Sequence, residues 1–261
     1  MVREAFNYSE AYETPVILRP TTRVCHASAA IDVGERERHE AEGFRRDTRW
    51  VIFPKLSRES HERIEARNPV LAEAFSRSGL NPVTGSGRKG IASGGVSWSY
   101  TQEALALLGA TDACRQLKLG TPYPFPELAA LDFLEGVDEV LVIEELSPYI
   151  EHELTRLCGK HHLAVTILGK GFASLPHAGE HSVEIAASAI SAFLGVDYEP
   201  EAVTVETALP ARPPVLCAGC PHRASFYAVK QAMKGRRAVF AGDIGCYTLG
   251  NARPLEMVDT C

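Results

Sequence analysis

Short apolar segments alternate with longer amphipathic ones between residues 88 and 195, and this alternation predicts strands and helices in turn. The strand-like segments lie at 90–93, 114–119, 137–144 and 162–168. The helix-like segments lie at 98–108, 126–134, 148–158 and 182–194. Strands that alternate with helices of about ten residues or more indicate βαβ units and a parallel sheet. The sequence therefore predicts a doubly wound α/β domain at residues 88–197.

The chain before this domain has a less regular pattern. Residues 2–13 predict a helix, and Pro15–Leu18 predicts a short buried strand. Residues 57–77 predict another helix, with an interruption at Pro69 because proline disfavours the helical conformation in the residue before it. The densely charged residues 35–49 predict a solvated linker.

A second α/β unit is expected to begin at Val215, after a proline-containing linker at residues 198–214. Its expected elements are a strand at 215–217, a helix at 224–233, a strand at 238–241 and a glycine-rich loop at 242–250. The chain opens directly on a helix and closes at Cys261 in mid-pattern. We expect both ends to cut through folded units, since termini usually fray into polar residues.

Composition narrows the class of protein. A chain with 45% hydrophobic and 23% charged residues has the balance of a soluble globular protein. The net charge of −6 argues against broad nucleic-acid binding, and no apolar run is long enough to span a membrane. The N-terminus lacks the apolar core of a signal peptide, so we expect a cytoplasmic location. Seven cysteines with irregular spacing suit metal binding or catalysis better than a disulfide framework.

The most informative segment is Leu216–Arg223, which reads LCAGCPHR and places a C-x-x-C pair at an expected strand-to-helix junction. Cys217 and Cys220 could ligate a metal or a cluster together. Alternatively, the first helical turn could bind a phosphate through its free N–H groups. A pair of small buried residues at a turn is the plainer alternative. No second C-x-x-C is present, which argues against a four-cysteine zinc site.

A second segment, AGDIGCYTLG at 241–250, follows an expected strand and carries three glycines. Ligands in parallel α/β sheets bind beyond the carboxyl ends of strands, and glycine allows the backbone to approach a ligand closely. Asp243 could orient a polar group or a cation, and the fold could bring Cys246 near the C-x-x-C pair. An ordinary strand-end turn is the alternative, although the two segments together are stronger evidence than either alone.

Several polar groups elsewhere are weaker candidates. His177 and His181 have a spacing that suits two metal ligands, but the neighbouring proline and glycine favour a loop. Glu144 and Glu145 follow the most apolar strand and suit a polar contact at a domain interface. The remaining groups are the Gly169–Gly171 turn, the basic helix end at His161–His162, and the polar cluster of Arg19, Thr21, Thr22, Arg23 and His26.

Together these segments resemble the large subunit of the indolepyruvate branch of the thiamine-diphosphate-dependent 2-oxoacid:ferredoxin oxidoreductase family. The resemblance is most specific at CAGCPHR and GDIGCYTLG, and it extends to PVILRPTTRVCHA, KGIASGGVSWSYTQEAL and VLVIEELSPYIEHEL. It implies that residues 1–33 end a pyrimidine-binding domain and that 34–87 form a linker. Residues 88–197 would then be a transketolase-C-terminal-like domain, followed by a linker at 198–214. Residues 215–261 would begin a truncated thiamine-diphosphate-binding domain.

The resemblance also implies an activity, the oxidative decarboxylation of arylpyruvates such as indolepyruvate to aryl-acyl-CoA. The implied cofactors are thiamine diphosphate, Mg²⁺ and [4Fe–4S] clusters, and the cofactor carries the hard organic step. The implied partners are a small β subunit, ferredoxin, coenzyme A and the arylpyruvate. No catalytic residue is assigned within this chain, because the activating glutamate and the magnesium motif are expected outside it. The chain alone is therefore expected to be inactive.

The family pattern places eight residues at the cofactor, namely Cys220, His222, Arg223, Asp243, Ile244, Gly245, Cys246 and Tyr247. In cluster-bearing relatives the equivalents of Cys217, Cys220 and Cys246 resemble iron–sulfur ligands, but the usual fourth ligand is not evident. The clusters are expected mainly in a C-terminal segment beyond this chain. Three alternatives remain open: a truncated non-catalytic scaffold, another 2-oxoacid:ferredoxin oxidoreductase, and an unrelated zinc-binding α/β protein.

Overall fold

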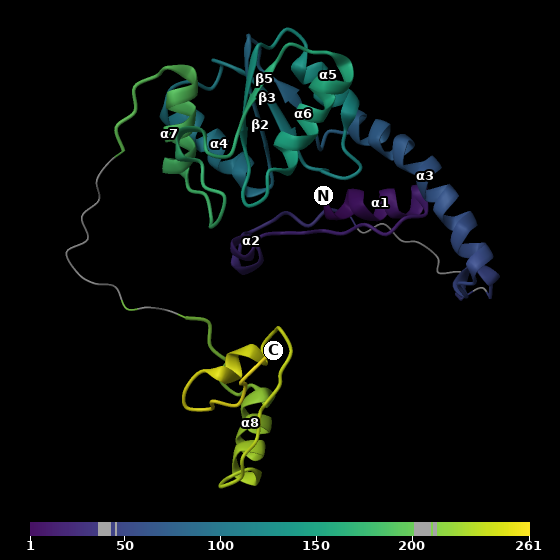
Figure 1. The fold of residues 1–261 in the computed structure, drawn as a ribbon, viewed down its shortest axis with the longest axis vertical. Coiled ribbons are helices and arrows are strands. Elements are labelled where there is room, and N and C mark those ends of the chain that lie inside the picture. Colours follow the sequence, from purple (N-terminus) through teal and green to yellow (C-terminus); the bar gives the residue numbers. More distant parts are fainter. Residues whose placement is uncertain (36–42, 45, 201–209, 211–212) are drawn as a thin grey trace. The chain divides into compact units, whose positions relative to one another are not determined.

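A computed structural model describes residues 1–35, 43–44, 46–200, 210 and 213–261 of the chain (Figure 1). It separates into two compact units, Met1–Glu201 and Ala202–Cys261. Much of the charged stretch expected as a solvated linker lies outside the described residues, as does most of the expected linker at 198–214. No helix in the described part of the chain is long and apolar enough to cross a membrane.

The first unit is built on a five-stranded sheet with the order β1-β3-β2-β4-β5. Its strands are β1 (Val83–Thr84), β2 (Lys89–Gly94), β3 (Arg115–Leu119), β4 (Glu139–Ile143) and β5 (Thr166–Leu168). All neighbouring strands are parallel except β1, which pairs antiparallel with β3. The central strands read as apolar runs because both of their faces are buried.

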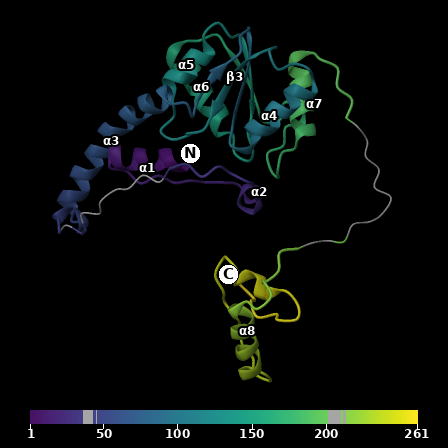
Figure 2. The same cartoon turned by 180° about the vertical axis from the view of Figure 1, so that it is seen from behind.

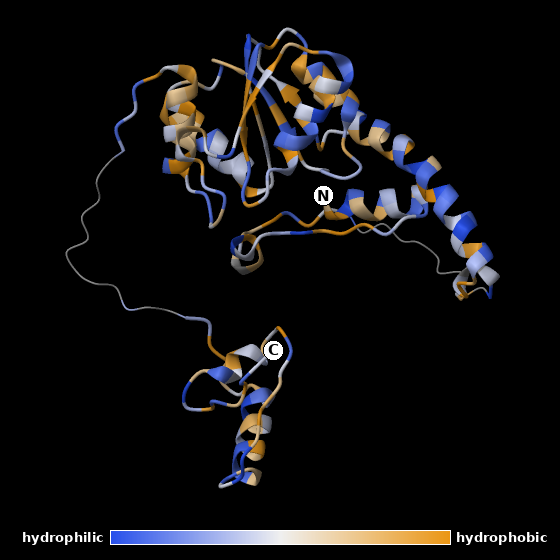
Figure 3. Ribbon diagram, viewed as in Figure 1, coloured by the Kyte–Doolittle hydropathy of each residue, from blue (hydrophilic) through white to orange (hydrophobic). Residues whose placement is uncertain are grey.

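Four helices cover the two faces of this sheet (Figure 1, Figure 2). They are α4 (Val96–Leu107), α5 (Glu127–Leu134), α6 (Tyr149–His161) and α7 (Val183–Leu194). Residues of α5 and α6 form one buried cluster with the sheet, and residues of α4 and α7 form the other. Figure 3 shows hydrophobic residues on the strands and on the helices beside them. The α/β class with a mainly parallel sheet, expected from the alternating pattern, is confirmed.

A close approach between α5 and β2 fixes the position of one helical layer. Phe133 of α5 is fully buried, and a Cβ atom at Gly90 of β2 would lie 2.6 Å from its ring. Real Cβ contacts of that length do not occur, so only glycine at position 90 lets the ring sit against the strand. Gly90, which the sequence marks only as part of a strand, therefore determines how closely α5 approaches the sheet.

The N-terminal elements differ in part from the expectation. Helix α1 (Val2–Tyr12) forms as predicted, but Pro15–Leu18 is not a strand, and the side chain of Ile17 is 88% exposed. A strand needs a neighbour for its backbone N–H and C=O groups, and no described strand lies beside this segment. A short helix, α2 (Thr22–His26), forms where a polar connection was expected, and a 3₁₀ turn, η1 (Thr48–Trp50), follows it.

Helix α3 (Pro54–Arg77) runs through Pro69, so the predicted interruption was wrong. The proline removes one backbone hydrogen bond, but the helix beyond it is anchored by Leu71 and Phe75, which are buried. The Arg67 guanidinium donates to the carbonyl oxygen of Glu13 at 2.8 Å. This bond supplies a partner at the end of α1, where helical carbonyls lack one.

Asn81 is a buried polar residue that joins the end of α3 to the end of β3. Its Oδ1 accepts from the backbone N–H of Gly120 at 2.9 Å and of Thr121 at 3.1 Å. Its Nδ2 donates to the carbonyl of Phe75 at 3.0 Å and to the Thr121 hydroxyl at 2.6 Å. The side chain is 2% exposed, so these four bonds replace all contact with water.

The second unit contains α8 (Pro221–Ala232) and a 3₁₀ turn, η3 (Thr248–Asn251). Its core consists of Leu216, Phe226, Met257 and Val258. The strands predicted at 215–217 and 238–241 do not form, apart from a single bridge between Ala241 and Thr260. Val239 remains 77% exposed, which is consistent with a segment that has no strand partner among the described residues.

Candidate functional site

The C-x-x-C pair lies on a tight turn at the start of α8. The backbone N–H of Cys220 donates to the carbonyl of Cys217 at 3.2 Å, and Gly219 has a φ of 73°. Pro221 then occupies the first helical position, where a missing N–H costs nothing. The sequence thus folds into a turn followed at once by a helix, and Cys220 sits at the junction.

The segments 217–223 and 242–250 contact each other through the rings of His222 and Tyr247, and Phe226 of α8 adds a third ring. The Sγ of Cys220 lies 3.2 Å from Nδ1 of His222. The His222 ring meets the Tyr247 ring edge to face, with centroids 4.8 Å apart, and Tyr247 in turn meets Phe226 at 5.2 Å. Such aromatic contacts stabilise a defined geometry beyond simple area burial. We refer to these two segments together as the cysteine–glycine site.

The loop at 242–250 is held in place by the hydroxyl group of Thr248 and by a close contact at Gly250. Thr248 Oγ1 donates to the carbonyl of Asp243 at 3.1 Å and accepts from the N–H of Gly245 at 3.3 Å. A Cβ atom at Gly250 would lie 2.5 Å from the Phe226 ring, so this close approach requires glycine. Phe226 was not expected at the site, although its position one helical turn after His222 places both on one face of α8.

Not every residue expected at a cofactor has a free functional group. The Arg223 guanidinium donates to the carbonyl of Leu216 at 2.7 Å, so it braces the turn before α8. Asp243 and Cys246 are exposed, and the side chain of Ile244 is 87% exposed. The first turn of α8 has no acidic residue, which leaves its positive dipole end available to an anion.

Within the described ranges, no group of three or more His, Cys, Asp or Glu side chains is arranged to hold a metal ion. The structure therefore does not assemble Cys217, Cys220 and Cys246 into a ligand set. The same holds for His177 and His181, the second pair with ligand-like spacing.

In the first unit, charged side chains gather beyond the end of β4. The Glu144 carboxylate accepts from the N–H groups of Ile150 at 2.9 Å and Glu151 at 3.0 Å, which caps the start of α6. Burial raises the pKa of the Glu144 carboxyl, although these two N–H groups favour its ionised form. The Lys170 ammonium donates to the carbonyl oxygens of Glu144 and Pro176 and so ties the following loop to the strand end.

His181 belongs to this loop and is 4% exposed. Its backbone N–H donates to Glu145 Oε1 at 2.9 Å, and the adjacent Glu180 forms an ion pair with Arg23 of the N-terminal polar cluster. Burial lowers the pKa of the His181 imidazole, and the Lys170 ammonium lowers it further. These contacts explain Glu145 and Arg23 as structural residues of the first unit.

Replacing His181 by glutamine is expected to change how stability depends on pH. The folded imidazole stays neutral below its ordinary pKa of about 6.5, whereas the unfolded chain takes up a proton there. Stability of the wild type therefore rises with pH from the lowered pKa up to about 6.5, and H181Q removes that slope. Urea unfolding at several pH values measures it. H177Q, at an exposed histidine of the same loop, is the control and should leave the slope unchanged.

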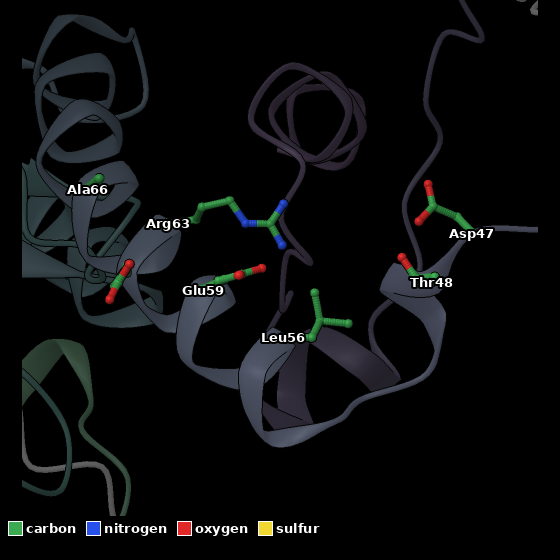
Figure 4. Close-up of a pocket in the computed structure, with 7 residues that line it drawn as sticks. Asp47, Thr48, Leu56, Glu59, Arg63 and Ala66 are labelled. Atoms are coloured by element: carbon green, nitrogen blue, oxygen red, sulfur yellow. The ribbon is translucent and has the colours of Figure 1, made fainter.

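A cavity of about 670 Å³ lies beside α3 in the first unit (Figure 4). Its lining is mostly charged and consists of Asp47, Thr48, Leu56, Glu59, Glu62, Arg63 and Ala66. None of these residues belongs to the cysteine–glycine site or to the cluster beyond β4. The cavity therefore adds no residue to either group.

Comparison with known proteins gives the family context. No family model matches the chain. The chain is 38% identical over 268 residues to the indolepyruvate oxidoreductase subunit IorA of Methanothermobacter thermautotrophicus, covering 99% of this chain and 43% of that protein. It is 36% identical over 276 residues to IorA of Pyrococcus horikoshii, covering 100% of this chain and 42% of that protein. The chain thus spans less than half the length of the curated relatives it matches.

Among solved structures, a 2-oxoglutarate:ferredoxin oxidoreductase from Magnetococcus marinus is similar, with a TM-score of 0.37 and 16% identity. The match covers 54% of this chain and 24% of that one. The sequence relatives are much closer, and they agree with the resemblance found at the two cysteine-containing segments. Over nearly its whole length, the chain is therefore a homologue of part of the indolepyruvate oxidoreductase subunit IorA, and the expected resemblance is confirmed.

Proposed function

We propose that this chain is part of the large subunit of a thiamine-diphosphate-dependent oxidoreductase that decarboxylates arylpyruvates such as indolepyruvate. In the whole protein, electrons would pass to ferredoxin through [4Fe–4S] clusters, and coenzyme A would take the acyl group. The observation that carries the proposal is the contact between segments 217–223 and 242–250 through His222 and Tyr247. Homologues named as indolepyruvate oxidoreductase subunits supply the reaction class.

The residues of the cysteine–glycine site fit one part of the cofactor, its diphosphate. The start of α8 offers a helix N-terminus without an acidic side chain, and His222 adds a donor in the first turn. Helix N-termini of this kind bind phosphate groups through free N–H groups and the helix dipole. In the loop at 242–250, the exposed Gly245 has no side chain to cover the backbone, so a phosphate group can approach its backbone closely.

Bound thiamine diphosphate supplies the nucleophilic carbon that decarboxylation of a 2-oxoacid requires. The residues of this chain bind and orient it. The His222 imidazole is held in place by Cys220 and Tyr247, and it would supply a donor to the diphosphate. Tyr247 packs edge to face against the buried Phe226 ring, and this contact fixes the loop at 242–250 beside α8. Mg²⁺, the clusters and the small β subunit would be bound by other parts of the whole protein.

Replacing His222 by alanine is expected to weaken binding of thiamine diphosphate with Mg²⁺ about tenfold or more. A hydrogen bond to a charged group contributes about 1.5–3 kcal/mol, and each 1.4 kcal/mol corresponds to about tenfold in Kd. Titration calorimetry of the chain with the magnesium complex measures the change. H61A, at an exposed histidine of α3 in the other unit, is the matched control and should bind like the wild type. Equal affinity of H222A and H61A for the magnesium complex would contradict the proposal.

A further inference from the structure

We propose that Cys217 and Cys220 form a redox-active dithiol that closes reversibly to an intramolecular disulfide. Both thiols are free in the structure, and they occupy the first and last positions of the turn that precedes α8. The dithiol is a property of this turn itself, so it does not depend on the binding of thiamine diphosphate.

The backbone already has the separation that a disulfide requires. The bond from Cys220 N–H to the Cys217 carbonyl, 3.2 Å long, defines a four-residue turn. The end Cα atoms of such a turn lie less than about 7 Å apart. Cysteine pairs bridged by a disulfide have Cα atoms about 4.4–6.8 Å apart. Gly219, with its φ of 73°, adopts the left-handed conformation of this turn without a Cβ penalty. Closure therefore needs rotation of side chains and little movement of the backbone.

The two thiols differ in their access to solvent, which assigns their roles. Cys217 is exposed and can meet a small disulfide in solution, whereas Cys220 is half-buried beside the His222 ring. Cys217 is therefore the attacking thiol, and Cys220 is the thiol that resolves the mixed disulfide.

The other cysteines lack this arrangement. Cys114 and Cys158 are buried in the first unit, and burial raises the pKa of the Cys114 thiol to about 11. A thiol in that state is a poor nucleophile at neutral pH. Cys25, Cys246 and Cys261 are exposed, but no second cysteine lies within a turn of any of them. Cys25 and Cys261 serve as matched single-thiol controls.

The oxidant is a small disulfide such as oxidised glutathione. The Cys217 sulfur attacks one glutathione sulfur, the glutathione S–S bond breaks, and one reduced glutathione leaves. The Cys220 sulfur then attacks Cys217 Sγ, the mixed disulfide breaks, and a second reduced glutathione leaves. Two protein thiols are oxidised, one small disulfide is reduced, and the two protons end on the two released thiols.

Closure has a consequence for the cysteine–glycine site. In the reduced chain, Cys220 Sγ contacts His222, whose ring packs against Tyr247. In the oxidised chain the same sulfur is bonded to Cys217 and is drawn away from the imidazole. Oxidation of the turn therefore alters the surroundings of His222, whose ring contacts Tyr247 and so joins segments 217–223 and 242–250.

The test is equilibration of the full chain in mixtures of reduced and oxidised glutathione, followed by acid quenching, alkylation and tryptic mass analysis. Trypsin releases residues 171–223 as one peptide whose only cysteines are the two of the turn. In the wild type this peptide is expected to become lighter by two hydrogen atoms and to resist alkylation. The change should reverse completely on addition of excess reduced glutathione.

Three variants distinguish this outcome from others. C220S is expected to accumulate glutathione on Cys217, since no resolving thiol remains. C217S is expected to lose the closed form completely, and the double control C25S/C261S should close like the wild type. Stable glutathione adducts on the wild-type peptide without closure would overturn the proposal. So would bound iron that protects both thiols from oxidation in the chain as isolated.

Discussion

Replacing Phe226 by alanine is expected to unfold the second unit and leave the first unit folded. Phe226 is 6% exposed and lies in a core that, among the described residues, has three other buried hydrophobic members. Truncation of a buried phenylalanine costs about 3–5 kcal/mol. A unit of about 60 residues has a total stability of about 3–9 kcal/mol, with small cores at the lower end. Amide hydrogen exchange should show loss of protection in α8 and unchanged protection in β2 and β4.

The neighbouring residue provides a matched control for this prediction. Tyr227 follows directly in α8, is also aromatic, and is 61% exposed. Y227A should change stability by no more than about 0.5 kcal/mol, as expected for surface positions without special contacts. If F226A and Y227A gave the same exchange pattern, the core of the second unit would not be centred on Phe226. Loss of protection in β2 as well would show that the units do not unfold separately.

Replacing Asn81 by leucine is expected to destabilise the first unit by about 3 kcal/mol or more. The substitution removes four hydrogen bonds and leaves the half-buried N–H groups of Gly120 and Thr121 without their side-chain acceptor. Each buried group left unsatisfied costs about 1–3 kcal/mol. Thermal unfolding followed by circular dichroism measures the loss. The Phe75 carbonyl loses its partner too, so the end of α3 should lose exchange protection first.

The isosteric variant N81D separates hydrogen bonding from packing. An aspartate keeps both acceptor bonds to the backbone but cannot donate to the Phe75 carbonyl when it is ionised. N81D should therefore be destabilised at neutral pH and recover part of the loss at acid pH, where the protonated carboxyl can donate. A stability of N81L within about 0.5 kcal/mol of the wild type would contradict the assignment of Asn81 as a hydrogen-bond centre.

The central strands of the first unit could be predicted because they are buried on both faces. Val140–Ile143 is an apolar run with every side chain buried, and such runs separated by amphipathic helices have few alternative folds. The positions of α4 to α7 followed from the same alternation. Sequence periodicity reports burial directly, so it is most reliable where burial is complete.

Three features could not be predicted because they depend on contacts distant in sequence. Pro15–Leu18 has the composition of a strand, but a strand also requires a neighbour, which sequence composition does not reveal. Pro69 looked like a helix break, yet burial of Leu71 and Phe75 outweighs one lost hydrogen bond. Asn81 has no sequence signature of a buried residue, and only the fold places it between α3 and β3.

The cysteine–glycine site, too, could be predicted from the sequence only in part. The two segments were recognised from their cysteines and glycines, because chemistry-bearing residues at element junctions form visible motifs. The residue that holds them together, Phe226, has no such signature, since a phenylalanine on a helix face usually marks an ordinary core. Its role became evident only from its contacts with Tyr247 and Gly250.

The edges of the sheet bear on how the first unit behaves at high concentration. The edge strands β1 and β5 have two and three residues, so each exposes very few backbone groups to a neighbouring molecule. Long, flat edge strands are the usual starting points for intermolecular sheet growth, and short edges suppress it. The longer strands β2 and β4, which are buried over most of their length and would be hazardous at an edge, lie inside the sheet. Fibril formation by this unit should therefore require prior unfolding.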